Sequence, residues 1–179
     1  MRIQIIGASG AGKSTLSAAL ARTLGLPLLS GDGYLWQDSD FTCRRPDGDI
    51  RAMLRADLAK YPDFVFDGQA DGFAPGIDLG RSALVLLLLP EPVRMERLRA
   101  REQARFGSRI APGGDLRQSS QEFLAWAAGY PADRSAGTSL GWHITLYNGF
   151  AGPKCVLSGT LPTEAQLRHI LRLLNAEPV

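Results

Sequence analysis

An eight-residue loop near the start of the chain narrows the choice of fold more than any other part of the sequence. The loop reads Gly7-Ala8-Ser9-Gly10-Ala11-Gly12-Lys13-Ser14 and matches the pattern G-x-x-x-x-G-K-[ST]. It lies between an apolar segment and a helical period, which is the context that a phosphate-binding loop requires. Its glycines let successive N–H groups face a phosphate, and the following helix adds a partial positive charge.

Each polar residue of this loop has a separate expected role. Lys13 is expected to reach the terminal phosphates of a nucleotide, and the Ser14 hydroxyl is expected to bind Mg²⁺. Thr15 is expected either to touch the α-phosphate or only to begin the helix. The whole segment from Gly7 to Thr15 is therefore a candidate binding site for ATP and Mg²⁺.

Five short segments predict strands because they are apolar throughout or nearly so, which is typical of strands covered on both faces. They are residues 2–6, 26–30, 64–66, 83–89 and 155–157. Helical periods alternate with them, over 16–24, 50–61, 92–105 and 163–174, the last opened by a capping box of Thr163 and Gln166. Alternation of strands and helices predicts an α/β fold with a parallel sheet.

The chain length predicts a single domain. A typical domain has about 150 residues, and this sequence has 179. The stretch 106–153 is less regular than the rest, with helical segments expected near 122–128 and 140–147. An insertion of this size in a small α/β domain is often a lid, so we expect it to cover a substrate.

Charge and composition exclude several classes of protein. The chain has 20 basic and 18 acidic residues, a net charge of +2, which is too balanced for a nucleic-acid coat or a membrane-surface anchor. The longest apolar run, residues 83–89, is far shorter than the roughly 20 residues that span a bilayer. Cys43 and Cys155 lack the spacing of a metal site or a disulfide framework. We therefore expect a cytoplasmic protein with no membrane or nucleic-acid partner.

Four features of the sequence together resemble a known group of proteins. They are the loop 7–14, an acidic residue after the second strand, the phrase Phe64-Val65-Phe66-Asp67-Gly68, and an arginine-rich helix after the fourth strand. This combination resembles the adenylate-kinase-like and shikimate-kinase-like P-loop kinases, including the kinase-like ATPases of the topology-modulation type. The resemblance covers most of residues 1–105 and the final strand and helix, and its Walker A loop is the most specific part.

The resemblance implies both a topology and an activity. It implies a three-layer P-loop domain whose five parallel strands have the order 2-3-1-4-5, with a helical lid and ATP bound at the carboxyl edge of the strands. It also implies transfer of a phosphoryl group to a small-molecule acceptor such as a nucleotide or a nucleoside. A nucleotide-binding regulator or a slow NTPase read by a protein partner is the alternative function.

Two carboxylates follow predicted strands at the edge where the phosphate loop lies. Asp32 is expected to orient an acceptor hydroxyl or to hold water on Mg²⁺, as in the kinases it resembles. Asp67 is expected to shape the Mg²⁺ shell. Either residue could instead serve only in a turn beside a glycine. No acidic pair of the kind that activates water in hydrolytic motors follows any strand, which disfavours that class.

Basic residues form two further candidate groups. Arg97, Arg101 and Arg105, with Arg109 beyond them, are expected to stabilise charge on the transferring phosphoryl group, or else to form a solvated face paired with glutamates. The expected acceptor site consists of Asp32, Trp36, Arg44, Arg45, Arg51 and Gly68. Adjacent arginines beside aromatic residues favour an anionic or aromatic acceptor.

A guanine nucleotide is disfavoured as the cofactor. Neither D-x-x-G nor N-K-x-D occurs in the sequence, so the switch and the base reader of GTPases are missing. The two histidines are isolated, and His143, between Trp142 and Ile144, is expected to be a packed aromatic neighbour rather than a base.

Overall fold

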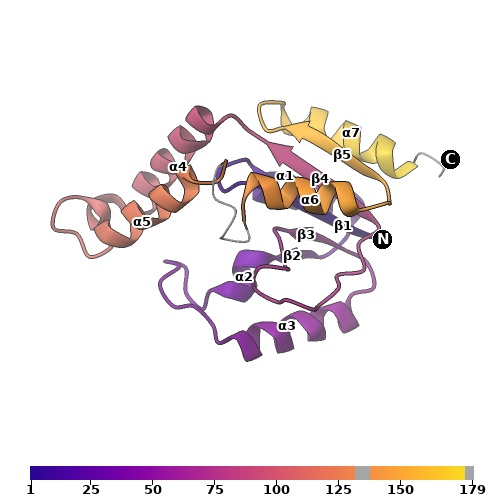
Figure 1. Ribbon diagram of the computed structural model, residues 1–179, viewed down its shortest axis with the longest axis horizontal. Helices are drawn as coiled ribbons and strands as arrows, with labels where there is room; N and C mark the ends of the chain where they lie inside the picture. The colour runs from indigo at the N-terminus through magenta and orange to yellow at the C-terminus, as the bar shows by residue number, and fades with distance from the viewer. Residues whose placement is uncertain (132–137, 176–179) are drawn as a thin grey trace.

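A five-stranded parallel sheet forms the centre of the protein (Figure 1). The computed structural model describes residues 1–131 and 138–175, and the strand order is β2-β3-β1-β4-β5. The strands are β1 (Arg2–Gly7), β2 (Leu28–Ser30), β3 (Phe64–Asp67), β4 (Ala83–Leu88) and β5 (Lys154–Ser158). Every neighbouring pair is parallel. The predicted sheet and its order are confirmed.

Helices alternate with these strands. They are α1 (Lys13–Leu24), α2 (Gly31–Leu35), α3 (Asp47–Lys60), α4 (Glu91–Phe106), the 3₁₀ turn η1 (Gly107–Ile110), α5 (Arg117–Ala128), α6 (Leu140–Gly149) and α7 (Thr163–Asn175). Gly25 ends α1 with a φ of 66°, a left-handed conformation that glycine adopts without steric cost. The helices that the apolar periods predicted are therefore present.

The sheet is covered on both faces, which explains why its strands are almost wholly apolar. On one face α1 and α7 pack their side chains, including Leu16, Leu20 and Ile170, against Ile5 and Val85 of the sheet. On the other face α3 covers β2 and β3, and α6 covers β1 and β4. The three layers place the loop after β1 at the carboxyl edge of the sheet.

The segment expected to form a lid has two structurally different parts. Leu146, Tyr147 and Phe150, in and just after α6, pack on Ile6, Leu84 and Leu86 of the sheet. This helix is thus part of the core. In contrast, α5 packs on α4 and lies with it away from the sheet in Figure 1. In the described part of the insertion, η1 and α5 lie outside the sheet core, so a covering role stays a prediction for these two elements.

One local prediction differs from the structure at the start of α7. The side-chain amide of Gln166 donates to the carbonyl oxygens of Ser158 and Leu161, each at 3.0 Å. It therefore ties α7 to the loop after β5 instead of forming a capping box with Thr163. The sequence motif did not reveal this because two carbonyl acceptors become available only when β5 and α7 pack together.

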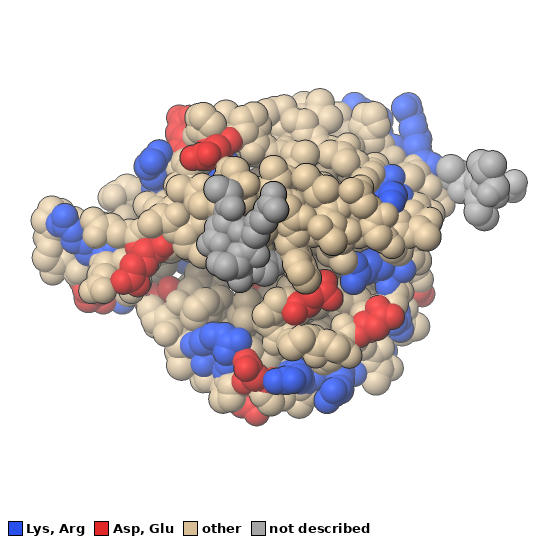
Figure 2. Space-filling model, in the orientation of Figure 1, with Lys and Arg blue, Asp and Glu red and all other residues tan. Residues whose placement is uncertain are grey.

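The surface carries mixed charge on the face shown in Figure 2. Basic and acidic side chains lie close together there, most clearly in the region of α3. Basic and acidic side chains are therefore mixed on this face, and neither sign of charge dominates it. Among the described helices, none combines the length and the apolar character that crossing a bilayer needs.

Candidate active site

The loop between β1 and α1 is shaped by three glycines with positive φ. Gly7, Gly10 and Gly12 have φ of 148°, 82° and 101°. A side chain at Gly7 would place its Cβ 2.3 Å from the carbonyl oxygen of Leu87 on β4. Glycine is therefore required at this position, because only its absent side chain lets β1 and β4 stay paired beside the loop.

Lys13, the first residue of α1, folds back across this loop. Its amine donates to the carbonyl oxygen of Ala8 at 3.1 Å. Burial lowers the pKa of Lys13, while the nearby carboxylates of Asp67 and Asp32 act in the opposite direction. The ammonium group is thus partly desolvated and lies within the electrostatic reach of both carboxylates.

Asp67 ends β3 with its carboxylate buried beside the loop. Its residue is only 7% exposed, and burial raises the pKa of this carboxyl, with the Lys13 charge and the Ser14 hydroxyl opposing that effect. Its Oδ1 atom has no hydrogen-bond partner in the described part of the chain. An orphaned buried carboxylate oxygen is costly unless a cation or donor binds it. The chemistry of Asp67 and Ser14 therefore fits a Mg²⁺ ion.

A magnesium ion here would depend on the nucleotide as well as the protein. Within residues 1–131 and 138–175, no group of three or more His, Cys, Asp or Glu side chains could hold a metal alone. Mg²⁺ is commonly bound through one or two protein oxygens together with substrate phosphates. A site with one buried carboxylate and one hydroxyl fits that arrangement.

Asp32 is brought to the same place by the register of the sheet. Ser30 pairs with Asp67, so the chain that leaves β2 passes directly beside the end of β3. Gly31 makes this approach possible, since an added Cβ would lie 3.1 Å from the carbonyl oxygen of Asp67. Asp32 itself is exposed, and its charge acts on both Lys13 and Asp67. The expected meeting of these three residues is present.

Two arginines of α4 lie near the phosphate loop. Arg97 Nη1 donates to the carbonyl oxygen of Gly159 at 3.3 Å and lies 4.0 Å from where a Cβ on Gly12 would be. The charge of Arg101 helps to lower the pKa of Lys13, so its guanidinium is also within electrostatic reach. Both positions are compatible with contact to a bound phosphate.

Arg105 and Arg109 have a different environment from the one expected. Arg105 donates to the carbonyl oxygen of Ser39, and its guanidinium carbon lies 4.1 Å from the centroid of the Phe41 ring. Arg109 pairs with Asp40 at 2.6 Å and with Asp115 at 2.8 Å. These two arginines connect the end of α4 and η1 to the loop after α2. Local sequence could not reveal the contacts with Ser39 and Asp40, because each of them joins segments more than 60 residues apart.

The expected acceptor residues other than Asp32 come from the loop between α2 and α3, from α3 itself and from the end of β3. Trp36 packs on Phe41, with ring centroids 6.0 Å apart, and forms an isolated antiparallel bridge with Arg44. Arg44 also pairs with Asp47 at 2.7 Å, and Arg51 donates to the Asp47 carbonyl oxygen. Gly68 lies beside Gly31 at the end of β3.

Arg45 differs from the other arginines of this region in its hydrogen bonding. It is half-buried, and its Nε atom is buried without a hydrogen-bond partner among the described residues. A buried donor of this kind favours an anionic group as its partner. It is therefore a better candidate for acceptor binding than Arg44, which is exposed and already paired.

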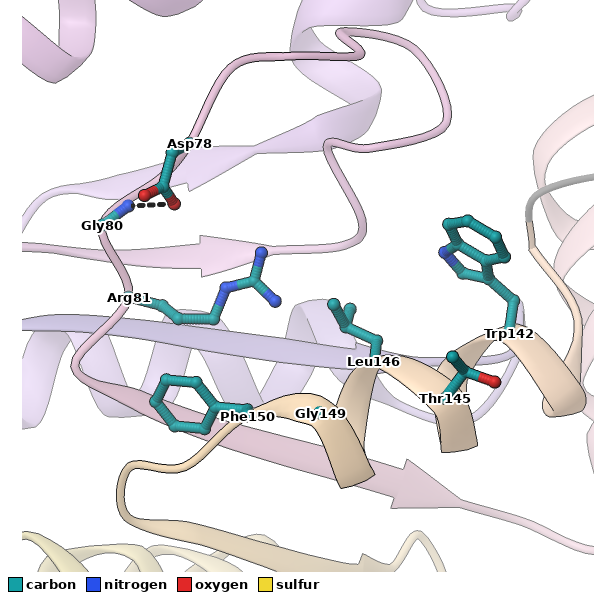
Figure 3. Close-up of a pocket in the computed structure, with 8 residues that line it drawn as sticks. All are labelled: Asp78, Gly80, Arg81, Trp142, Thr145, Leu146, Gly149 and Phe150. Carbon is teal, nitrogen blue, oxygen red and sulfur yellow. Dashed lines mark hydrogen bonds between the residues drawn. The ribbon is translucent and has the colours of Figure 1, made fainter.

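A separate cavity of about 490 Å³ lies on the far side of α6 from β5 and contains none of the predicted residues (Figure 3). Its lining includes Arg81, which points toward Leu146, and Trp142 stands at its other end. Arg81 lies two residues before β4, so this part of the cavity is at the amino edge of the sheet. The phosphate loop is at the carboxyl edge, and we place the candidate active site there.

Solved structures of small-molecule kinases share this architecture over almost the whole chain. Deoxyadenosine kinase from M. mycoides with bound dATP matches with a TM-score of 0.59 and 15% identity, over 98% of this chain and 100% of that one. Shikimate kinase from Acinetobacter baumannii in complex with shikimate matches with a TM-score of 0.55 and 14% identity, over 97% and 92% of the two chains. The fold is therefore that of the P-loop small-molecule kinases.

A closer sequence relative identifies the family. The chain is 38% identical over 128 residues to the uncharacterized protein YqaC of Bacillus subtilis (strain 168), a match that spans 72% of this chain and 71% of YqaC. The protein therefore belongs to the YqaC family. No protein-family model matches the sequence.

Proposed function

We propose that this protein is a phosphotransferase that moves the terminal phosphoryl group of ATP to a small-molecule acceptor in the presence of Mg²⁺. The observation that carries the proposal is the meeting of Lys13, Asp67 and Asp32 at the carboxyl edge of the sheet, directly beside the glycine loop. A loop that only bound a nucleotide would not need the exposed carboxylate of Asp32 at this point.

Each residue of the site has a separate role in the proposed phosphoryl transfer. The loop N–H groups and the Lys13 ammonium bind the phosphates, while Ser14 and Asp67 supply oxygen ligands for the cation. ATP with Mg²⁺, when bound, supplies the phosphoryl group and neutralises part of its charge. Asp32 orients the acceptor and accepts its proton, and Arg97 and Arg101 stabilise the charge that spreads over the transferring group.

The acceptor in this proposal is an anionic or aromatic small molecule. Trp36 and Phe41 offer a packed aromatic surface, and in the same loop Arg45 has a buried donor with no partner among the described residues. A nucleoside or a nucleotide has both a planar ring and groups that suit an arginine. The likeness to a deoxyadenosine kinase supports this class, while the likeness to shikimate kinase keeps other hydroxylated metabolites in the panel to be tested.

The proposal also includes a cover over the site and a location in the cell. We place η1 and α5 over the bound substrates as a cover, because Arg105 and Arg109 already connect this region to the acceptor-side loop. We also place the protein in the cytoplasm, where ATP is abundant and where the free thiols of Cys43 and Cys155 stay reduced.

The test is ATP consumption by the purified protein with Mg²⁺, screened against nucleosides, nucleoside monophosphates and hydroxylated metabolites. Asp32→Asn is expected to lower acceptor-dependent turnover by at least about 100-fold, because a positioned acid or base typically contributes that much. ATP binding should remain within about threefold of wild type, since Asp32 does not belong to the phosphate loop. Asp49→Asn, which changes an exposed carboxylate on α3, is the matched control.

Two outcomes would count against the kinase assignment. A slow ATP turnover that no acceptor increases would favour the regulator or slow NTPase instead. Equal loss of ATP binding and turnover in Asp32→Asn would mean that this residue serves the nucleotide and not the acceptor. Lys13→Ala should abolish nucleotide binding under either function, so it confirms only that the loop is the site.

A further inference from the structure

Three buried polar residues behind the phosphate loop have no part in the proposed chemistry. They are Arg94 on α4, Tyr130 just after α5, and His143 on α6, which are 1%, 9% and 1% exposed. Arg94 heads the arginine series of α4, but unlike Arg97, Arg101 and Arg105 it is fully buried. Burying a guanidinium costs free energy of desolvation unless its contacts in the protein offset that cost. The buried position of Arg94 therefore needs a physical explanation.

Arg94 is in direct contact with the phosphate loop. Its Nη1 atom donates to the carbonyl oxygen of Ser9 at 3.4 Å, a long hydrogen bond. At Gly10, an added Cβ would lie 3.0 Å from Arg94 Cγ and 2.8 Å from Leu98 Cγ. The middle of the loop therefore rests against α4, with no room for a side chain between them.

The contact with Ser9 also sets the direction of an N–H group. In a planar trans peptide the C=O and the following N–H point in opposite directions. When Arg94 holds the Ser9 carbonyl oxygen, the Gly10 N–H must point away from α4. Within the described residues this N–H forms no hydrogen bond, so it is available to a ligand.

Tyr130 contacts Arg94, and His143 in turn contacts Tyr130. The guanidinium carbon lies 5.5 Å from the centroid of the Tyr130 ring, within the range of a cation–π interaction. The Tyr130 hydroxyl is 2.8 Å from Nδ1 of His143. Nη2 of Arg94 is buried with no partner in the part of the chain that the structure describes. The ring of Tyr130 is thus a main constraint on where the guanidinium lies.

Burial also fixes the protonation of this set. It raises the pKa of Tyr130 to about 12, so the phenol keeps its proton near pH 7. It lowers the pKa of His143 to about 4, with the Lys13 charge acting in the same direction, so the ring is neutral near pH 7. Arg94 stays charged, because a guanidinium keeps its proton in proteins. The set therefore carries one positive charge, on the residue that contacts the loop.

We propose that Arg94 is a positioning residue for nucleotide binding, which orients the Ser9–Gly10 peptide so that its N–H faces the phosphates, and that Tyr130 and His143 hold Arg94 in place. Arg94 acts through the backbone and touches no substrate atom. The inference deepens the proposed function only in assuming that the loop binds a nucleotide. It does not depend on whether an acceptor exists.

The test measures the affinity for a fluorescent N-methylanthraniloyl ADP with Mg²⁺, without any acceptor. Arg94→Met is expected to weaken binding about tenfold, the effect of losing one hydrogen bond from a charged donor. Arg94→Lys, which keeps a charged donor, should restore part of that loss. The control is Arg99→Met, an exposed position on the same helix, which should bind like wild type.

Two further measurements separate positioning from a general effect on folding. Tyr130→Leu should weaken binding, and combining it with Arg94→Met should add little further loss, because both changes release the same peptide. Tyr130→Phe, which keeps the ring, should lose less than Tyr130→Leu. The amide resonance of Gly10 in the nucleotide-free protein should shift in Arg94→Met and stay in place in Arg99→Met.

The proposal is overturned if folded Arg94→Met binds the nucleotide within twofold of wild type, or if its loss and that of Tyr130→Leu simply add. If Arg94→Met does not fold, the test uses Arg94→Lys and the two Tyr130 variants instead. Unchanged nucleotide binding in all three variants then overturns the proposal. Nucleotide binding without phosphoryl transfer would leave this inference standing while removing the proposed function.

Discussion

At the scale of single residues, the phosphate loop keeps ionisable groups in unfavourable surroundings. Burial lowers the pKa of Lys13 and raises that of Asp67, so both charges cost free energy in the ligand-free protein. A polyphosphate would satisfy the ammonium, and a divalent cation would satisfy the carboxylate. The residues are thus arranged for charges that a substrate brings, which is common where a fold holds a functional site.

The neutral state of His143 leads to a prediction about pH. Its pKa is about 4 in the folded protein, against an ordinary value of about 6.5, because its ring is buried. Between these values the unfolded chain binds a proton that the folded protein does not. The free energy of unfolding should therefore fall by up to about 3 kcal/mol as the pH decreases from about 6.5 to about 4.

Urea denaturation at a series of pH values checks this prediction. In His143→Gln the acid-dependent loss of stability should be smaller than in wild type over the same pH range. His169→Gln, at an exposed position of α7, is the matched control and should follow the wild-type curve. Parallel curves for His143→Gln and wild type would show that this histidine titrates alike in both states.

At the scale of elements, α4 connects the phosphate loop to the loop that follows α2. Its 16 residues extend for about 24 Å at 1.5 Å per residue. Arg94 contacts the phosphate loop near one end, and Arg105 contacts Ser39 and Phe41 near the other. One helix therefore touches both the phosphate loop and the loop that we propose for acceptor binding.

Removal of Arg109 tests this connection. Arg109→Gln breaks the pairs with Asp40 and Asp115 that join η1 to the loop after α2. We expect faster hydrogen exchange in residues 37–45, with little change in the global stability, because all three side chains are at least partly exposed to solvent. Arg117→Gln, in the first turn of α5, is the control. Unchanged exchange in 37–45 would mean that this loop is held by other contacts.

At the scale of the whole molecule, one apolar core joins the beginning and the end of the chain. Side chains of α1 and α7 pack in the same cluster on one face of the sheet, and β4 lies between β1 and β5. Contacts between distant parts of the chain are what make a small domain unfold as one unit. The structure therefore predicts a single cooperative transition that depends on α7.

Ile170 in α7 provides the test of that dependence. It is fully buried in the cluster that includes Leu16 and Leu20 of α1. Ile170→Ala should lower the free energy of unfolding by about 3 kcal/mol, since it leaves a cavity in a packed core. His169→Ala, one residue away on the exposed side, should change it by less than about 0.5 kcal/mol. Separate unfolding of α7 before the sheet would contradict the single transition.

Much of the fold and part of the candidate site could be predicted from local sequence. Apolar runs that alternate with helical periods define a parallel sheet, and the glycine pattern from Gly7 to Gly12 defines its phosphate loop. Asp32 and Asp67 could be placed together because carboxyl ends of parallel strands share one edge. The strands, helices and glycine loop depend on residues a few positions apart, and the shared edge follows from a rule that holds for any parallel sheet.

The partners of the long side chains were decided only by the tertiary structure. Arg94, Arg97, Arg101 and Arg105 follow one spacing in the sequence, yet the first is buried behind the phosphate loop and the last contacts Phe41. Their partners are 85 and 66 residues away along the chain. Helical spacing determines which side of α4 an arginine occupies, but burial and partners depend on the segments that the fold brings against it.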